Sequence, residues 1–101
     1  MKYSFRSQHI EVTELDRQQM DNKLDRLKKH LSPPFVIDVN CIREHLRSAG
    51  EMVKCSITIE QGKKVFHADR TASSMQSALD EVIAALQKEL AKKHDKRKDH
   101  S

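Results

Sequence analysis

The sequence predicts a single α+β domain with the element order β-α-β-β-β-α, in which two helices pack on one face of a four-stranded sheet. The chain has 101 residues, the size of one domain with a modest core. Two segments repeat apolar residues at spacings of three and four, as helices do, and three shorter segments alternate apolar and polar residues, as strands do. Strands with one polar face favour an antiparallel sheet that is solvated on its other side.

The N-terminal third is predicted to hold a strand, a helix and a proline stop. Residues 2–7 alternate, with Tyr3 and Phe5 on one face. The helix is expected over roughly residues 14–31, with Thr13 as its N-cap, because a threonine hydroxyl accepts a bond from a first-turn N–H. Its apolar stripe consists of Met20, Leu24, Leu27 and Leu31. Residues 32–34, Ser-Pro-Pro, end it because proline cannot continue a helix.

The middle of the chain is predicted to form strands over residues 35–42 and 52–60, joined by a polar connection over residues 43–51. Cys41 and Cys55 fall on the apolar faces of these strands, so we expect two small buried side chains. Neither a disulfide nor a zinc site is expected, because the chain lacks C-x-x-C spacing and a cytosolic location is the default. A tight turn at residues 61–64 leads into a short fourth strand, whose inward face the sequence does not fix.

The second helix is expected to begin near residues 72–74. Its stripe consists of Met75, Ala78, Leu79, Val82, Ile83, Leu86 and Leu90. The next positions on this stripe are Lys93 and Arg97, so the core is expected to end near Leu90 while the helix continues. We therefore expect an α+β domain over residues 1–91 and a basic helical extension over residues 92–101.

Positive charge is concentrated at the C-terminal end. The net charge is +4, and residues 86–101 hold six Lys and Arg against three acids. Lys88, Lys92 and Lys96 share one flank of the second helix. Lys23, Arg26 and His30 share one flank of the first helix. If the helices pack side by side, these flanks could form one basic groove, but the sequence does not fix whether they face each other. Such a surface is either a solvated tail or a site for an acidic partner.

Two stretches resemble the ribosome hibernation-promoting factor and ribosome-associated inhibitor family. The first is IEVTELDRQQMDNKLDRLKKHL, residues 10–31, where the family has an "(I/V)-x-(I/V)-T" segment before a helix ending in "K-L-x-K". The second is FHADRTASSMQSALDEVIAALQKELAKKHDKRKDH, residues 66–100. The positions that match there are Met75, Ala78, Asp80, Ile83, Leu86, Leu90 and Lys92. Ser74, Gln76 and Ala85 depart from a family acid, aromatic and lysine. With no acidic tail or second domain, the chain is similar to the short hibernation-promoting type.

The resemblance implies a small ribosomal subunit as partner. Members bind its RNA in the channel between head and body, block the places of messenger and transfer RNA, and silence translation. The short type supports ribosome dimerisation with a partner factor. With few aromatic residues for base stacking, we expect binding to phosphates through helix cations. The expected rRNA-binding residues are Lys23, Arg26, Lys28, Lys29, Lys88, Lys92, Lys93, Lys96 and Arg97, with Lys92 on a family lysine.

The sequence also bears on three other functions. A general double-stranded RNA-binding module shares a sheet with two helices on one face, but lacks a strand before the first helix. An enzyme is not expected, because the six histidines are scattered without the spacing of a dyad or a metal site. A protein-interaction module with an acidic partner remains open. We expect no catalytic residue, cofactor, metal, small-molecule substrate or membrane contact, and a cytoplasmic protein, because no apolar run spans a bilayer and the N-terminus lacks a signal-peptide core.

Overall fold

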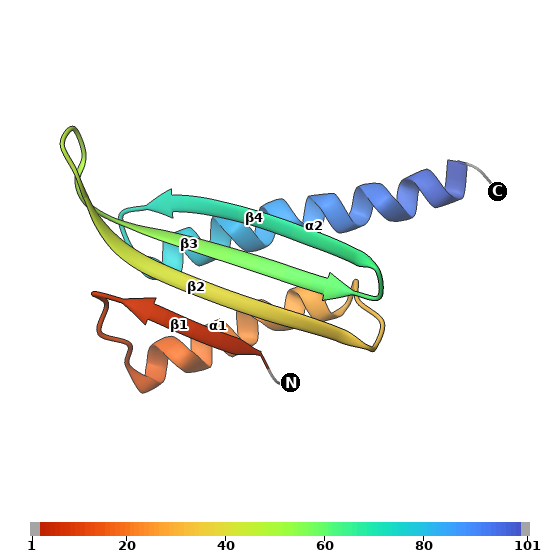
Figure 1. The fold of residues 1–101 in the computed structure, drawn as a ribbon, viewed down its shortest axis with the longest axis horizontal. Coiled ribbons are helices and arrows are strands. Elements are labelled where there is room, and N and C mark those ends of the chain that lie inside the picture. The colour runs from red at the N-terminus through yellow and green to blue at the C-terminus, as the bar shows by residue number, and fades with distance from the viewer. Residues whose placement is uncertain (1–2, 100–101) are drawn as a thin grey trace.

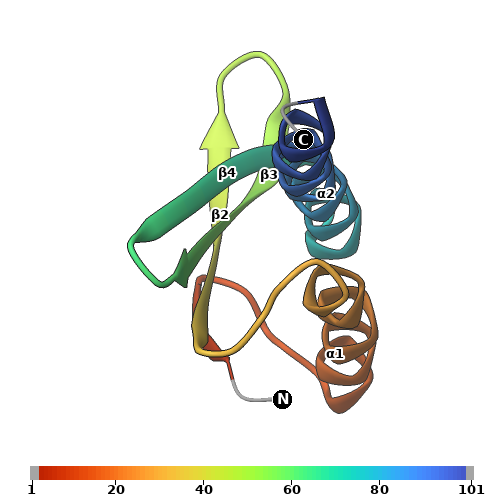
Figure 2. The same cartoon turned by 90° about the vertical axis from the view of Figure 1, so that its right-hand side faces the viewer.

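The computed structural model describes the backbone of residues 3–99 and the side chains of residues 3–92. The elements follow the predicted order: β1 (Ser4–Gln8), α1 (Glu14–Lys28), β2 (Phe35–Leu46), β3 (Gly50–Gln61), β4 (Lys64–Ala72) and α2 (Met75–Asp99). Both helices lie on the same side of the four-stranded sheet, as the end-on view in Figure 2 shows, and they run in the same direction along it (Figure 1). The predicted fold class is confirmed.

The sheet is mixed, with the strand order β1-β2-β3-β4. β2, β3 and β4 form an antiparallel meander, as expected for strands joined by short turns. β1 pairs parallel to β2, which the sequence did not reveal. The parallel pairing follows from α1, because this helix carries the chain back along the sheet before β2 begins.

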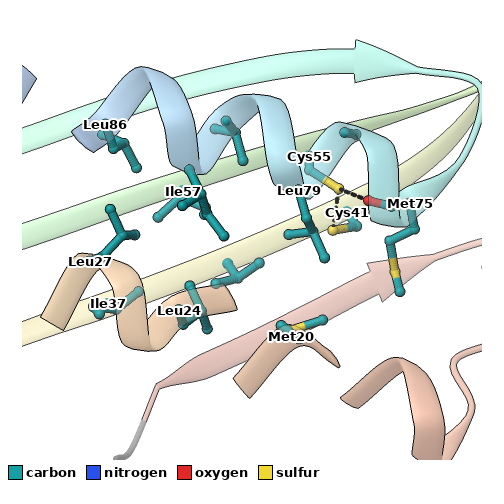
Figure 3. Close-up of a cluster of buried hydrophobic side chains, with 14 of the residues drawn as sticks. Met20, Leu24, Leu27, Ile37, Cys41, Cys55, Ile57, Met75, Leu79 and Leu86 are labelled. Atoms are coloured by element: carbon teal, nitrogen blue, oxygen red, sulfur yellow. Dashed lines mark hydrogen bonds between the residues drawn. The ribbon is translucent and has the colours of Figure 1, made fainter. Parts of the chain in front are cut away.

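The core lies between the sheet and the apolar stripes of the two helices. Every predicted stripe residue of α2 is buried, as are Met20, Leu24 and Leu27 of α1 (Figure 3). The N-cap prediction is also confirmed: the Thr13 hydroxyl accepts from the Asp16 N–H at 3.1 Å, and the Asp16 carboxylate accepts from the Thr13 N–H at 3.0 Å. This reciprocal pair fixes the start of α1.

The predicted end of α1 at residue 31 was wrong, because the helix ends at Lys28. The N–H of His30 bonds to the carbonyl of Leu27 and that of Leu31 to the carbonyl of Lys28, so the last turn tightens before the prolines. Leu31 lies beyond the helix but still packs against the core. The apolar period therefore continues one turn further than the helix does.

The predicted connection over residues 43–51 was also wrong, since β2 and β3 continue through most of it. Their ladder runs to the pair Leu46↔Gly50, and only residues 47–49 form the turn. Gly50 has a φ of +73°, which glycine adopts without a side-chain clash. Figure 1 shows this hairpin extending past the other elements. Little of it is buried, so its sequence lacks the alternation that marks a strand.

β4 is longer than the predicted fourth strand, and its register settles which face is inward. Phe66 pairs with Ile59, Ala68 with Ile57 and Ala72 with Val53, and all three partners are core residues. Arg70 pairs with buried Cys55 and belongs to the same inward face, although its own side chain is exposed. The tight turn before β4 is confirmed, with Gly62 at a φ of +60°.

Candidate nucleic-acid interface

The two flanks of α2 face different elements. One flank lies against α1, where Lys23 of α1 contacts Gln76 and Asp80 of α2. The other flank carries Lys88 and Lys92 and borders β4. For the side chains of residues 3–92, the two predicted basic flanks therefore do not face each other.

Lys23 is engaged within the fold. Its Nζ donates to Gln76 Oε1 at 2.5 Å and to the Gln76 carbonyl at 3.3 Å, and it lies 3.2 Å from Asp80 Oδ1. Its side chain is only 15% exposed. An ammonium group has three donors, and these contacts use them. Lys23 thus joins α1 to α2 rather than presenting its charge to solvent.

Gln76, at a position where the resembled family has an aromatic residue, is part of the same network. Its Nε2 donates to Asp16 Oδ1 at 3.3 Å, so the amide bridges Lys23 and the capping carboxylate of α1. The pKa of the Asp16 carboxyl is lowered, first by the hydrogen bond from the Thr13 backbone and further by bonds from the Thr13 hydroxyl and Gln76, against an opposing effect of burial. Gln76 therefore donates to a carboxyl group whose ionised form is favoured in the fold.

An open groove of about 440 Å³ lies on the other side of α2, between this helix and β4. We call it the basic groove, and it is lined by Val65, Phe66, His67, Ala68, Arg70, Ala85, Lys88, Glu89 and Lys92. Its charged side chains are three cations and one anion, a net charge of +2 with His67 neutral. The hollow beside Met75 and the hollow beside Ser4 are each lined by one arginine and no lysine, so the basic groove is the more positive of these three cavities.

The basic groove runs along the outer edge of β4. Val65 and His67 belong to the solvated face of the sheet, whereas Phe66, Ala68 and Arg70 belong to the face that α2 covers. Side chains of both faces can line one hollow only where that hollow follows the strand edge. In the described sheet β4 has no neighbour on this side. β4 is thus the edge strand of the described sheet, and the cations of the basic groove lie beside it.

A second set of cations gathers where α1 ends, and we call it the basic end. Gln61 Nε2 donates to the Ser32 carbonyl at 3.0 Å, which ties the β3–β4 turn to the loop after α1. The exposed cations of this end are Arg26, Lys28, Lys29, Lys63 and Lys64. α2 passes the same end of the sheet on its way to the C-terminus, with its second half beside Val65 at the start of β4 (Figure 1). The basic groove and the basic end therefore occupy the same half of the molecule.

The predicted site residues divide into three groups. Arg26, Lys28, Lys29, Lys88 and Lys92 are exposed, while Lys23 is engaged with α2. Lys93, Lys96 and Arg97 fall on helical backbone of α2, and their side chains lie outside the described residues. Sequence reasoning missed Arg70, Lys63 and Lys64. The two lysines follow a glycine turn, a signal that could have found them, whereas Arg70 gave none without the strand register.

The cysteines form no reactive site. Cys41 and Cys55 are opposite each other in the register, buried and free, with their sulfurs 2.6 Å apart (Figure 3). The hydrogen bond with Cys41, reinforced by burial, raises the pKa of the Cys55 thiol. A buried thiol that resists ionisation is a poor nucleophile. The predicted burial of both side chains is confirmed.

One hydroxyl–imidazole contact lies on the solvated face of the sheet. Thr58 Oγ1 is 2.8 Å from His67 Nδ1, and His67 Nε2 is 3.6 Å from Asp69 Oδ2. His67 and Asp69 are exposed and Thr58 is half-buried, so the arrangement lacks the enclosed surroundings that strengthen catalytic electrostatics. Within residues 3–92, no three His, Cys, Asp or Glu side chains are grouped to hold a metal, and neither helix has the length and hydropathy to cross a membrane.

Comparison with known proteins identifies the family and the fold. The model of the family described as Sigma 54 modulation protein / S30EA ribosomal protein matches residues 3–98. Among solved structures, a ribosomal subunit interface protein from Coxiella burnetii aligns with a TM-score of 0.74 and 15% identity, covering 94% of this chain and 99% of its own. The N-terminal domain of Thermus thermophilus Protein Y aligns with a TM-score of 0.72 and 14% identity, covering 89% of this chain and 96% of its own. At these identities the two structures show a shared fold.

Proposed function

The chain belongs to the Sigma 54 modulation protein / S30EA ribosomal protein family, and from this membership we propose that it is a ribosome hibernation factor that binds the RNA of the small ribosomal subunit. The family is one of ribosome-associated modulation proteins, not an enzyme family. We propose that the protein occupies the channel between the head and body of the subunit. There it would block the placement of messenger and transfer RNA and silence translation.

The extent of the family match carries this proposal. Residues 3–98 include all six elements except the last residue of α2, so the match covers the sheet, both helices, the basic groove and the basic end. A ribosome-associated protein must present cations to phosphate, because phosphate contacts supply most of the affinity for nucleic acid. The concentration of cations in one half of the molecule supports such a contact.

The surface favours recognition by shape and charge over reading of bases. The chain contains one Tyr, three Phe and no Trp, and Tyr3, Phe5, Phe35 and Phe66 all pack against the core. Proteins that read single strands on a sheet instead expose aromatic side chains for stacking. A folded RNA channel is recognised largely through its backbone. The small subunit is therefore a better match to this surface than an unstructured RNA.

We propose the exposed helix cations as the rRNA contacts. They are Lys88 and Lys92 of the basic groove and Arg26, Lys28 and Lys29 of the basic end. Lys93, Lys96 and Arg97 join them from the sequence of the C-terminal extension. Lys23 remains in the proposal only as a residue that holds α1 against α2. The proposal also places the protein in the cytoplasm, where it would act on ribosomes idled by stress or in stationary phase.

Co-sedimentation with isolated small subunits tests this function. We expect the protein to sediment with the subunit at low and moderate salt, and to remain bound in the presence of excess short duplex RNA. Prior loading of the subunit with messenger and transfer RNA should prevent binding. Loss of the protein to the duplex would indicate a general double-stranded RNA-binding module instead. Failure to bind at low salt would contradict a ribosomal role.

Dimerisation of ribosomes is a separate part of the proposal. We propose that the protein supports dimerisation together with a partner factor, as the short hibernation-promoting type does. Sedimentation of whole ribosomes with the protein, with and without an extract containing such a factor, tests this. Dimers that form only when both are present are the expected result, and unchanged single ribosomes would contradict it while leaving subunit binding intact.

A further inference from the structure

We propose that Arg70 completes a phosphodiester-binding site in the basic groove, so that one strand of rRNA backbone lies between Arg70 on β4 and Lys88 and Lys92 on α2. This inference rests on the proposed function and deepens it. Arg70 lies outside the residues that the sequence pattern or the family resemblance selected. The strand register and the groove lining bring it to the two lysines.

The placement of Arg70 on a fixed strand makes it a defined contact. Its pairing with Cys55, whose side chain is in the core, fixes the backbone from which the guanidinium extends. Arg70 Nη1 donates to the Asp69 carbonyl at 2.7 Å, which orients the guanidinium and uses one of its five N–H donors. The remaining donors suit two phosphate oxygens at once, which a lysine cannot match.

Arg70 and the two lysines line the groove from two elements. Lys88 and Lys92 are one helical turn apart on α2, and Arg70 belongs to the neighbouring strand, so cations border the groove from both sides. The apolar residues Val65, Ala68 and Ala85 also line the groove. Glu89 is the one opposing charge in the lining.

An acidic peptide pairing with the β4 edge is the other ligand that this groove could accept. The backbone of RNA is favoured for two reasons. Cations of the basic end continue positive charge in the same half of the molecule, which suits the regularly spaced charges of a nucleic-acid strand. The family is also ribosome-associated. Cross-linking from position 70 distinguishes a contact with RNA from a contact with protein.

Three variants and a salt series test the proposal. The dissociation constant for isolated small subunits is measured at several salt concentrations for wild type, Arg70→Gln, Arg70→Lys and Arg6→Gln. Arg6 is the matched control, because it is an exposed arginine beside a hollow on the opposite, solvated face of the sheet. Equal thermal unfolding midpoints show that the exposed substitutions leave the fold intact.

We expect Arg70→Gln to weaken binding roughly fivefold at moderate salt and to reduce the slope of log K against log salt by about one, because one phosphate contact is lost. Arg70→Lys should keep the slope and recover part of the affinity, and Arg6→Gln should match wild type. An Arg70→Gln protein with wild-type affinity and slope would overturn the inference while leaving the proposed function intact. A wild-type protein that does not bind subunits would instead overturn the proposed function.

Cross-linking identifies the ligand of the groove. The variant Arg70→p-benzoylphenylalanine is bound to small subunits at low salt and irradiated. A cross-link to ribosomal RNA is expected. A cross-link to a ribosomal protein alone would overturn the proposal in favour of a peptide at the β4 edge.

Discussion

Lysines lie on both sides of α2, but their surroundings differ. On the side where α1 packs, Lys23 of α1 is 15% exposed, pairs with Asp80 and donates to the Gln76 amide oxygen. On the flank facing β4, Lys88 and Lys92 are exposed and border an open groove that also contains Arg70. All three lysines lie on helix flanks beside an apolar stripe, so the sequence predicts the same role, binding of rRNA, for each. The difference arises from the neighbouring element, and it separates cations that hold the fold from cations that remain available to a ligand.

The largest expected effect comes from removing the two positive charges on the flank of α2 that borders β4. The double variant Lys88→Gln and Lys92→Gln should weaken small-subunit binding roughly thirtyfold, if each lysine contributes about 1 kcal/mol and the two contributions add. The thermal unfolding midpoint should not change, because both side chains are exposed. The matched control is Arg6→Gln with Lys54→Gln, two cations of the solvated sheet face. Equal losses in the two double variants would mean that binding follows net charge rather than the groove.

The next effect concerns the contact between α1 and α2, and it is an effect on stability instead of binding. Lys23→Met should lower the free energy of unfolding in urea by about 1–2 kcal/mol, because Gln76 loses a hydrogen-bond donor and Asp80 loses its cation. Lys88→Met should change it by less than about 0.5 kcal/mol.

In a binding assay performed well below the thermal unfolding midpoint, the order of the two effects should reverse. Lys23→Met should keep most of the wild-type affinity, whereas Lys88→Met should lose part of it. If Lys23→Met is fully stable and binds subunits as weakly as Lys88→Met, then Lys23 leaves Asp80 to bind RNA, and the contrast between the two flanks disappears.

A smaller effect of opposite sign should come from the one acid in the basic groove. Glu89→Gln should tighten subunit binding about two- to threefold, because the variant no longer repels a phosphate near Lys88 and Lys92. The gain should shrink with added salt. Glu81→Gln, on the same helix but outside the groove lining, is the control. Tightening of both variants by the same factor would assign the effect to total charge.

The smallest expected effect is a pH dependence of stability, caused by Asp16 of α1, which accepts a hydrogen bond from Gln76 of α2. The pKa of the Asp16 carboxyl is lowered in the folded protein, so its ionised form adds stability above the ordinary pKa of about 3.9. That contribution is lost as the pH falls through the lowered value. In urea unfolding, Asp16→Asn should be less stable than wild type near neutral pH by a few tenths of a kcal/mol or more, and the difference should narrow in acid. A difference that is constant with pH would show that the charge of Asp16 is not involved.

Periodicity in the sequence was sufficient for the helices and for most of the sheet. Spacings of three and four found every buried position of α2 up to residue 92, and alternation found β2 and β3 where they are buried on one side. Alternation carries no direction, so the parallel pairing of β1 was not foreseeable from it. It also fails where a hairpin is exposed on both faces, so the sequence predicts a loop where the structure has the end of β2 and the start of β3.

The sequence predicts only those residues of the candidate site that lie together on one helix. Lys88 and Lys92 are one turn apart in sequence, so a helical repeat places them together. Arg70 reaches them only through the register of β4, and that register depends on pairing with β3. The engagement of Lys23 depends on Asp80, which is far away in the sequence and adjacent only when α1 packs on α2. Contacts between elements are therefore what sequence patterns leave undetermined.

The position of the basic groove along the outer edge of β4 has a consequence for the behaviour of the protein at high concentration. An uncovered edge strand is a template for pairing with another molecule and hence for aggregation. A second copy approaching this edge would bring its own Arg70, Lys88 and Lys92 against the same residues, and like charges would repel the two copies. We therefore expect the cations of the groove to oppose self-association, and their removal to lower the solubility of the protein.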